Sequence, residues 1–134
     1  MSDCIFCKII QGEIPSTKVF ESKDLVAFLD IMPANKGHTL IVPKKHFDDL
    51  ESADPKILAE MTKLAQKISK AVLEFCDGTN IVINNKPAAG QIINHMHMHV
   101  IPRHSENNFK FDWPHRKYED DINLYSEKIK KSLQ

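Results

Sequence analysis

The sequence has 134 residues, of which 42% are hydrophobic and 27% are charged, as in an ordinary folded domain with one hydrophobic core. Its 18 basic residues balance 18 acidic ones, so the chain lacks the electrostatic field that attracts nucleic acid or an anionic membrane, and we expect neither as a partner. No segment is apolar over the length of a transmembrane helix, and the amino terminus has no export-signal pattern, which predicts a cytosolic (cytoplasmic) protein.

Two cysteines, Cys4 and Cys7, form a CxxC pair near the amino terminus. In a reducing compartment this spacing is typical of a metal site, a redox pair or two buried thiols, and no thioredoxin-like βαβ pattern surrounds it. A zinc ion would need two more ligands, and either His46 or His95 could help to complete a Cys2His2 site. Four protein ligands leave no open position for water, so such a zinc would be structural.

Three strands are predicted next along the chain. Runs rich in apolar and β-branched residues predict them over Lys18–Glu21, Leu25–Asp30 and His38–Pro43. A short helix is expected either within the first fifteen residues or over His46–Leu50.

One long helix is predicted over residues 54–77. Asp54 offers an N-cap carboxylate, Pro55 suits the first helical position, and Gly78 provides a stop. Apolar residues recur every three or four positions, and the face that they form is expected to lie on the sheet. These residues are Ile57, Leu58, Met61, Leu64, Ala65, Ile68, Ala71, Val72 and Phe75.

Two further strands are predicted over Thr79–Asn84 and His95–Pro102, and Tyr118–Leu133 carries a weaker helical pattern. Strands with a helix inserted among them and short connections elsewhere predict an α+β fold, with a five-stranded, mostly antiparallel sheet and one long helix. We expect residues 1–134 to form a single domain.

The last predicted strand alternates imidazoles with apolar side chains. In an extended chain His95, His97 and His99 point to one face, and Met96 and Met98 point to the other. Neighbouring imidazoles would then be about 6.5 to 7 Å apart at their roots. One such histidine is most often an ordinary polar strand position. Three on one face favour a functional site, since closely spaced imidazoles repel one another when protonated.

Two kinds of site compete at this strand: a His-ligated metal centre, and phosphate chemistry with an imidazole nucleophile. The loop before it contains Ala88, Ala89 and Gly90, small residues that let backbone N–H groups approach an anion. Alternate positions on one strand spread their ligating atoms in a row rather than around a tetrahedron, which disfavours the metal centre. We therefore expect an anion held beside an imidazole.

Three ordered segments resemble the histidine triad (HIT) family, in particular its small Hint-like bacterial and archaeal members. They are CIFCKIIQGEIPS, AFLDIMPANKGHTLIVPKKH and AGQIINHMHMHVIPR, within residues 3–103, and residues 104–134 form a tail without an assigned role. The resemblance implies a homodimer in which two five-stranded sheets join into a ten-stranded one, with the helix of residues 54–77 and an edge strand at the interface. The implied activity is hydrolysis or transfer at the α-phosphate of a purine nucleoside phosphoramidate or dinucleoside polyphosphate. It proceeds through a covalent nucleotidyl-histidine and releases AMP or GMP.

The resemblance also implies roles for individual residues. His97 would be the nucleophile, His99 would contact the phosphate, and Asp30 would bind ribose hydroxyls. Asn84 and the backbone of Gly90 and Gln91 would position the phosphate. The apolar walls around the base would be Phe6, Ile9, Ile14, Phe28 and Ile31, and the zinc ligands would be Cys4, Cys7, His46 and His95.

Three positions depart from the family pattern. Ile92 stands where several members carry Ser or Thr, so it would offer the phosphate its backbone N–H but no hydroxyl. Asn94 replaces an often aromatic residue, and Lys86-Pro87 replaces a turn that contains glycine.

Imidazole suits the implied reaction because its pKa, near ~6.5, leaves it mostly unprotonated at neutral pH. Attack gives a phosphoramidate that water then releases, and no catalytic metal is required. One alternative is a hydrolase with a catalytic metal on His95, His97 and His99, which chelator-sensitive turnover would favour. The other is a nucleotide-binding regulatory or scaffold protein, which an absence of turnover would favour.

Overall fold

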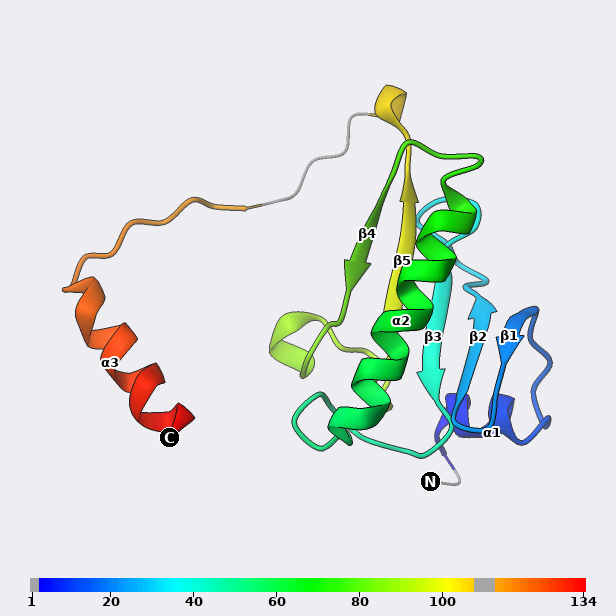
Figure 1. Cartoon of the computed structure of the whole chain (residues 1–134), viewed down its shortest axis with the longest axis horizontal. Coiled ribbons are helices and arrows are strands. Elements are labelled where there is room, and N and C mark those ends of the chain that lie inside the picture. Colours follow the sequence, from blue (N-terminus) through cyan, green and yellow to red (C-terminus); the bar gives the residue numbers. More distant parts are fainter. Residues whose placement is uncertain (1–2, 108–112) are drawn as a thin grey trace.

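The computed structural model describes residues 3–107 and 113–134 (Figure 1). Among them, the helices are α1 (Ile5–Ile10), α2 (Pro55–Val72) and α3 (Ile122–Leu133), with short 3-10 turns η1 (Pro87–Ala89) and η2 (Ser105–Asn107). The strands are β1 (Lys18–Glu21), β2 (Leu25–Leu29), β3 (Thr39–Pro43), β4 (Gly78–Val82) and β5 (Met98–Arg103).

The strands form one sheet in the order β1-β2-β3-β5-β4, and each neighbouring pair is antiparallel. β5, the last strand along the chain, lies between β3 and β4, where Val100 stands opposite Thr39 on one side and Ile81 on the other. The predicted α+β fold with a five-stranded sheet is therefore confirmed, and β1 and β4 are its edges among the described residues.

α2 lies across one face of this sheet (Figure 1), as its apolar pattern predicts. Asp54 caps the helix by accepting a hydrogen bond from the Lys56 N–H at 2.9 Å, and Pro55 occupies the first turn. The wholly buried Met61 packs in one cluster with Ile41 of β3 and Val100 of β5. Burying such a side chain stabilises the fold by roughly 1.5–3 kcal/mol.

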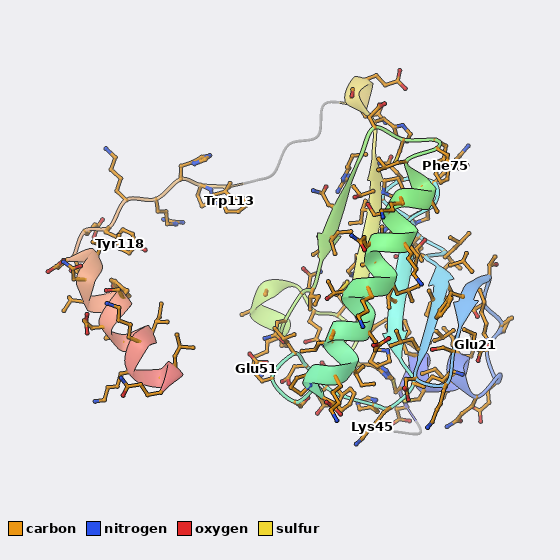
Figure 2. All side chains as sticks on the ribbon, in the orientation of Figure 1. Glu21, Lys45, Glu51, Phe75, Trp113 and Tyr118 are labelled. Carbon is orange, nitrogen blue, oxygen red and sulfur yellow. The ribbon has the colours of Figure 1, made fainter. Side chains whose placement is uncertain are left out.

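The helix ends at Val72, before the predicted residue 77. The Leu73 N–H still bonds four residues back, to the Ser69 carbonyl, but the Glu74 and Phe75 N–H groups bond only three residues back, to the Ala71 and Val72 carbonyls, so the helix tightens into a turn. Phe75 was expected on the core face, but 54% of it is exposed at the end of α2 (Figure 2). There its ring lies against Gly37, at the turn before β3.

The short helix α1 covers the opposite face of the sheet, which confirms the first of the two expected positions for a short helix. Phe6 and Ile9 pack against side chains of β2 and β3 whose neighbours in sequence face α2. These side chains are Val26, Phe28, Leu40 and Val42. Both faces of the central strands are therefore buried, and they read as continuous apolar runs.

β5 begins at Met98, three residues after the predicted start at His95. Pro43, on the neighbouring strand, explains the difference: it has no N–H, and its carbonyl accepts a hydrogen bond from His95 Nε2 at 2.7 Å. Pro43 therefore has neither an N–H nor a free carbonyl with which to pair to β5. β4 loses its partner at the same level and ends at Val82 instead of Asn84.

α3 confirms the helical pattern in the tail from residue 122 onward, with Asp121 as its N-cap. It lies away from the sheet, beyond the segment that carries Trp113 and Tyr118 (Figures 1 and 2). One side of it is apolar and exposed, namely Ile122, Tyr125, Ile129 and Leu133. None of the described helices is both long and apolar enough to span a bilayer.

Candidate functional site

A cavity of about 480 Å³ lies between α1, the end of β2 and the segment that leads into β5. Every residue that the sequence predicted to bind the nucleotide lines it, except Gln91. These residues are Phe6, Ile9, Ile14, Phe28, Asp30, Ile31, Asn84, Gly90, Ile92, His97 and His99. The structure thus brings together side chains from four separate parts of the chain.

The cavity is lined by both apolar and polar side chains. Side chains of α1 and β2, including Phe6 and Phe28 with ring centroids 5.6 Å apart, form an apolar wall. Asp30, Asn84 and His99 are polar groups of the same cavity. Such a space suits a flat apolar ring joined to a polar, anionic group. Sequence reasoning missed further lining residues, which are Ile5, Pro15, Ser16, Leu29, Met32, Leu40 and Ile93.

The three imidazoles lie on the α1 side of the sheet, opposite Met96 and Met98, as strand alternation predicts, but they do not all belong to one regular strand. Only His99 lies in β5, while His95 and His97 belong to the irregular segment before it. His95 is wholly buried and faces the cysteines of α1, whereas His97 and His99 line the cavity with ring centroids 4.9 Å apart. The apolar half of the prediction is confirmed, because Met96 and Met98 are buried in the cluster beneath α2.

A backbone carbonyl sets the tautomer of His97. His97 Nδ1 lies 2.7 Å from the His95 carbonyl oxygen, which can only accept, so Nδ1 carries the proton and Nε2 keeps its lone pair. Burial beside Phe6 lowers the pKa of His97, although the bond to the carbonyl opposes that shift. At neutral pH the residue is therefore an uncharged imidazole with a nucleophilic nitrogen.

A fourth histidine, His38, sets the tautomer of His99. The Ala34 N–H donates to His38 Nδ1 at 3.1 Å, so the His38 proton is on Nε2. That N–H donates to His99 Nδ1 at 2.9 Å, which leaves His99 with an Nε2–H donor. Burial lowers the pKa of His99 to about 4 and also lowers the pKa of His38, so both rings stay neutral. Sequence reasoning missed His38, which had only been placed at the start of a strand.

The four predicted metal ligands come together beside this cavity. One ligand atom from each of Cys4, Cys7, His46 and His95 lies within 4.8 Å of the others. His46 Nε2 donates to Asp48 Oδ1 at 2.7 Å, and His95 Nε2 donates to the Pro43 carbonyl. Both histidines therefore turn an Nδ1 lone pair towards the sulfurs, at distances of 3.3 to 3.6 Å.

This geometry fits a tetrahedral zinc. Ligand atoms bonded to one zinc ion lie roughly 3.3 to 3.8 Å apart, given its usual bond lengths. Cys4 and Cys7 are free thiols, and two thiolates with two imidazoles are a common donor set for structural zinc. A single metal held by His95, His97 and His99 does not fit, because His95 directs its free nitrogen into the cysteine cluster.

The loop before β5 differs from its expected use. The Gly90 N–H bonds to the Pro87 carbonyl and the Gln91 N–H bonds to the Lys86 carbonyl, so both backbone donors assigned to the phosphate are engaged within the loop. Ile92, the next residue, has a side chain 92% exposed at the cavity. Its N–H bonds to no group within residues 3–107 and 113–134.

Comparisons with known proteins identify the family of this chain. The HIT domain profile matches residues 11–106. An uncharacterised HIT-like protein of Methanocaldococcus jannaschii is 49% identical over 102 residues, which cover 75% of this chain and 79% of the relative. Adenylylsulfatase HINT3 of Arabidopsis thaliana is 43% identical, with 76% of this chain and 53% of that protein covered. Adenosine 5'-monophosphoramidase hnt1 of Schizosaccharomyces pombe is 38% identical, with 83% of each chain covered.

Solved structures share the fold as well. A crystal structure of a HIT family protein from Bacillus anthracis has a TM-score of 0.88 at 38% identity, covering 98% of both chains. A zinc-bound histidine triad family protein from Mycobacterium smegmatis has a TM-score of 0.79 at 33% identity, covering 99% of both chains. The profile match spans most of this chain. The three relatives are 38% to 49% identical to it, over 75% to 83% of its length. This chain therefore belongs to the HIT domain family.

Proposed function

We propose that this protein is a hydrolase that acts at the α-phosphate of a purine nucleotide through a nucleotidyl adduct of His97. The observation that carries the proposal is the hydrogen bond from His97 Nδ1 to the His95 carbonyl, which leaves a neutral nucleophile at the cavity. Similarity to the monophosphoramidase hnt1 and the adenylylsulfatase HINT3 supports an adenylyl group as the part recognised, with AMP as product; GMP would follow from a guanylyl substrate.

The base lies against the apolar wall formed by Phe6, Ile9, Ile14, Phe28 and Ile31, and the ribose lies near Asp30. One oxygen of this carboxylate is already held, because Asp30 Oδ1 accepts from the Met32 N–H at 2.9 Å. The other oxygen remains to accept from ribose hydroxyls. In this binding mode we expect the α-phosphate to lie beside Asn84, His97 and His99.

His97 Nε2 then attacks phosphorus. The N–P bond forms as the bond to the leaving group breaks, and the leaving group departs with that electron pair and a proton taken from solvent. In the second step water forms a new O–P bond and gives up a proton to solvent, while the N–P electron pair returns to His97. The His97 Nδ1–H stays on the His95 carbonyl throughout, which stabilises the positive charge of the adduct.

Negative charge on the phosphate oxygens needs fixed donors. The Nε2–H of His99, the side chain of Asn84 and the Ile92 N–H supply them. Donors of this kind stabilise a transition state by about 3–4 kcal/mol each when they are held rigidly in a site that excludes water. His38 contributes indirectly, because it keeps the His99 proton on Nε2.

We also propose a structural zinc on Cys4, Cys7, His46 and His95, in a cytosolic protein whose thiols stay reduced. Bound there, zinc ties the start of α1 to the segment before β5. The zinc-bound relative from Mycobacterium smegmatis supports this assignment. The proposed chemistry uses no catalytic metal.

A homodimer is proposed for the same molecule, with α2 and an edge strand at the two-fold interface. β4 is an edge of the sheet, and 46% of its Ile81 is exposed. At the end of α2, Leu73 and Phe75 are also about half exposed, at 46% and 54%. Pairing of these surfaces would bury apolar area and close a sheet edge.

The deciding experiment measures turnover of an adenosine phosphoramidate and of a diadenosine polyphosphate, each with and without a chelator. Faster turnover of the phosphoramidate, unaffected by brief chelation, is the expected result. Turnover that stops at once when a chelator is added, while the fold is retained, would favour a catalytic metal. Tight nucleotide binding without turnover of either substrate would favour a regulatory or scaffold role.

A further inference from the structure

The loop of residues 84–91, called here the phosphate loop, is held from the inside by one side chain. Gln91 is only 6% exposed, and its amide group is fully used. Its Oε1 accepts from the Lys86 N–H at 2.7 Å, and its Nε2 donates to the Asp48 carbonyl at 2.7 Å and to the Ile93 carbonyl at 3.0 Å. The amide thus joins Lys86 within the loop and Ile93 just beyond it to Asp48, in a separate segment of the chain.

Lys86, the residue that Gln91 holds, is in an unfavourable conformation. Its φ of 73° and ψ of 158° fall in a region that is essentially confined to glycine. A lysine stays there only if its surroundings hold it. One contact that holds Lys86 in this conformation is the hydrogen bond from its N–H to Gln91 Oε1.

Other contacts between the phosphate loop and residues 48–51 lie at the surface. Asn85 Nδ2 donates to Glu51 Oε1 at 2.7 Å, and Lys86 Nζ lies 2.6 Å from Asp49 Oδ2. Figure 2 shows Glu51 on the outside, beside the yellow-green turn of η1. The Leu50 N–H also donates to Asn85 Oδ1 at 2.9 Å, again at an exposed position. Contacts that are exposed to solvent contribute little to rigidity. Among the contacts between the loop and residues 48–51, the hydrogen bond of the Gln91 amide is the one made by a buried side chain.

The cavity side of the same loop provides the donors for an anion. Asn84 stands at the start of the loop and lines the cavity, and the free N–H of Ile92 follows directly after Gln91. The positions of both groups depend on the loop between them, since neither lies in a strand or helix. The base and ribose, in contrast, meet α1 and β2, which Gln91 does not touch.

We propose that Gln91 is a positioning residue for the phosphate: its buried amide holds the strained phosphate loop against residues 48–51, so that Asn84 and the Ile92 N–H meet the phosphate. This inference rests on the proposed function only in taking the cavity as a nucleotide site. Gln91 acts on the phosphate half of the ligand and leaves recognition of the nucleoside unchanged.

The test is calorimetric binding of AMP and of adenosine to the full chain, zinc-loaded where zinc is present. Gln91→Met keeps the size of the side chain and removes its three hydrogen bonds. It should weaken AMP binding about 10-fold, on the order of one to two lost hydrogen bonds, and change adenosine binding less than about 2-fold. Gln66→Met, on the exposed side of α2, is the matched control and should change neither.

Equal weakening of AMP and adenosine binding would overturn the inference, because a general loss of structure affects both. Unchanged AMP binding would overturn it as well. Wild-type protein that binds neither ligand would overturn the proposed nucleotide site together with this inference. If the wild type binds both ligands and Gln91→Met prefers AMP to adenosine to the same degree, only the role of Gln91 is overturned.

A second variant covers the case in which Gln91→Met folds poorly. Glycine adopts the backbone conformation of residue 86 without strain, so the loop with Lys86→Gly depends less on its brace. The double variant Lys86→Gly/Gln91→Met should therefore bind AMP at least about 3-fold more tightly than Gln91→Met does. If Gln91→Met does not fold, the double variant should prefer AMP to adenosine as the wild type does. A double variant that folds normally but still does not prefer AMP to adenosine as wild type does would overturn the argument from strain.

Discussion

His95 directs its carbonyl oxygen to His97 Nδ1 at 2.7 Å and its own ring to the sulfurs of Cys4 and Cys7. One residue therefore belongs both to the metal cluster and to the support of the nucleophile. Its main-chain carbonyl sets the tautomer of the proposed nucleophile, while its side chain would hold the proposed zinc. We therefore expect replacement of His97 to affect turnover and replacement of His95 to affect zinc content and stability, although the two residues are only two positions apart.

His97→Ala should abolish turnover, because the nucleophile is lost while the metal ligands remain. Base-quenched wild-type protein should carry a nucleotidyl group on His97, identified by mass spectrometry of peptides, since phosphoramidates survive base and not acid. Zinc content should equal that of the wild type. The ring is 9% exposed and packs on Phe6, so some loss of melting temperature is expected from the cavity left behind. Near-normal turnover of His97→Ala, or an adduct on another histidine, would contradict the mechanism.

His95→Ala should instead lose zinc and stability together. A structural metal contributes folding free energy that disappears with a ligand. Metal analysis should find about one zinc per wild-type chain and much less in the variant, whose melting temperature should fall markedly and no longer respond to a chelator. His115→Ala, at an exposed position of the tail, is the control and should match the wild type. Wild-type protein without zinc, or with Cys4 and Cys7 joined by a disulfide under reducing conditions, would refute the assignment.

His99→Ala should lower kcat by roughly 10 to 1,000-fold with zinc retained, because one donor to the phosphate charge is removed. His38→Ala should reproduce part of this loss, although His38 is not expected to contact the substrate. Without His38, the His99 proton is no longer held on Nε2. The double variant should be little worse than His99→Ala alone, because both changes act through one imidazole. Fully additive losses would show that His38 acts by another route.

Stability should fall as the pH drops from the ordinary histidine pKa of 6.5 towards 4, because burial lowers the pKa of His99 to about 4 in the folded protein. In this window the unfolded chain binds a proton that the folded chain does not, so acid favours unfolding; above 6.5 the residue is neutral in both states and contributes no slope. Thermal melts of wild type and His99→Asn over this range test it. The slope should be smaller for the variant, and parallel curves would contradict the assignment.

Sedimentation at micromolar concentration should give a mass near twice the 15.3 kDa of one chain. Ile81→Lys, on the edge strand β4, should shift the protein towards the monomer, because a charge there opposes pairing of sheet edges. Lys8→Glu in α1, which lies on the opposite face of the sheet from α2, serves as the control. A wild-type monomer at this concentration would contradict the proposed dimer.

Much of the fold is predictable because its determinants are local. The signal for the start of α2 consists of the adjacent residues Asp54 and Pro55. The alternation that predicts burial of Met96 and Met98 is also contained in a few consecutive residues. The start of β5 is not local, since it depends on Pro43, which meets His95 only after the sheet has formed. The exposed position of Phe75 is not local either, since its ring lies against Gly37, which is far from it in the chain.

The site shows the same division. Local alternation indicated the histidines, but Phe6, Asp30 and Asn84 became candidates only through resemblance to a family, because nothing in their spacing shows that they share a cavity. His38 stayed unrecognised because its partner His99 is 61 residues away and the register between them requires the strand order. Gln91 was assigned to the phosphate by its backbone, and its buried amide became visible only with the position of Asp48.

The distance along the chain between Cys4 and His95, 91 residues, also has a consequence during synthesis. At about 5–20 residues per second, a ribosome needs roughly 5 to 20 s to add the partner of that cysteine. Through this interval the nascent chain carries the thiols of Cys4 and Cys7 without His95, and β3 lacks its neighbour β5. The amino-terminal half therefore cannot complete its fold first, and the growing chain depends on late closure of long-range contacts. We therefore expect the thiols of Cys4 and Cys7 to be most open to oxidation before the segment that contains His95 has emerged.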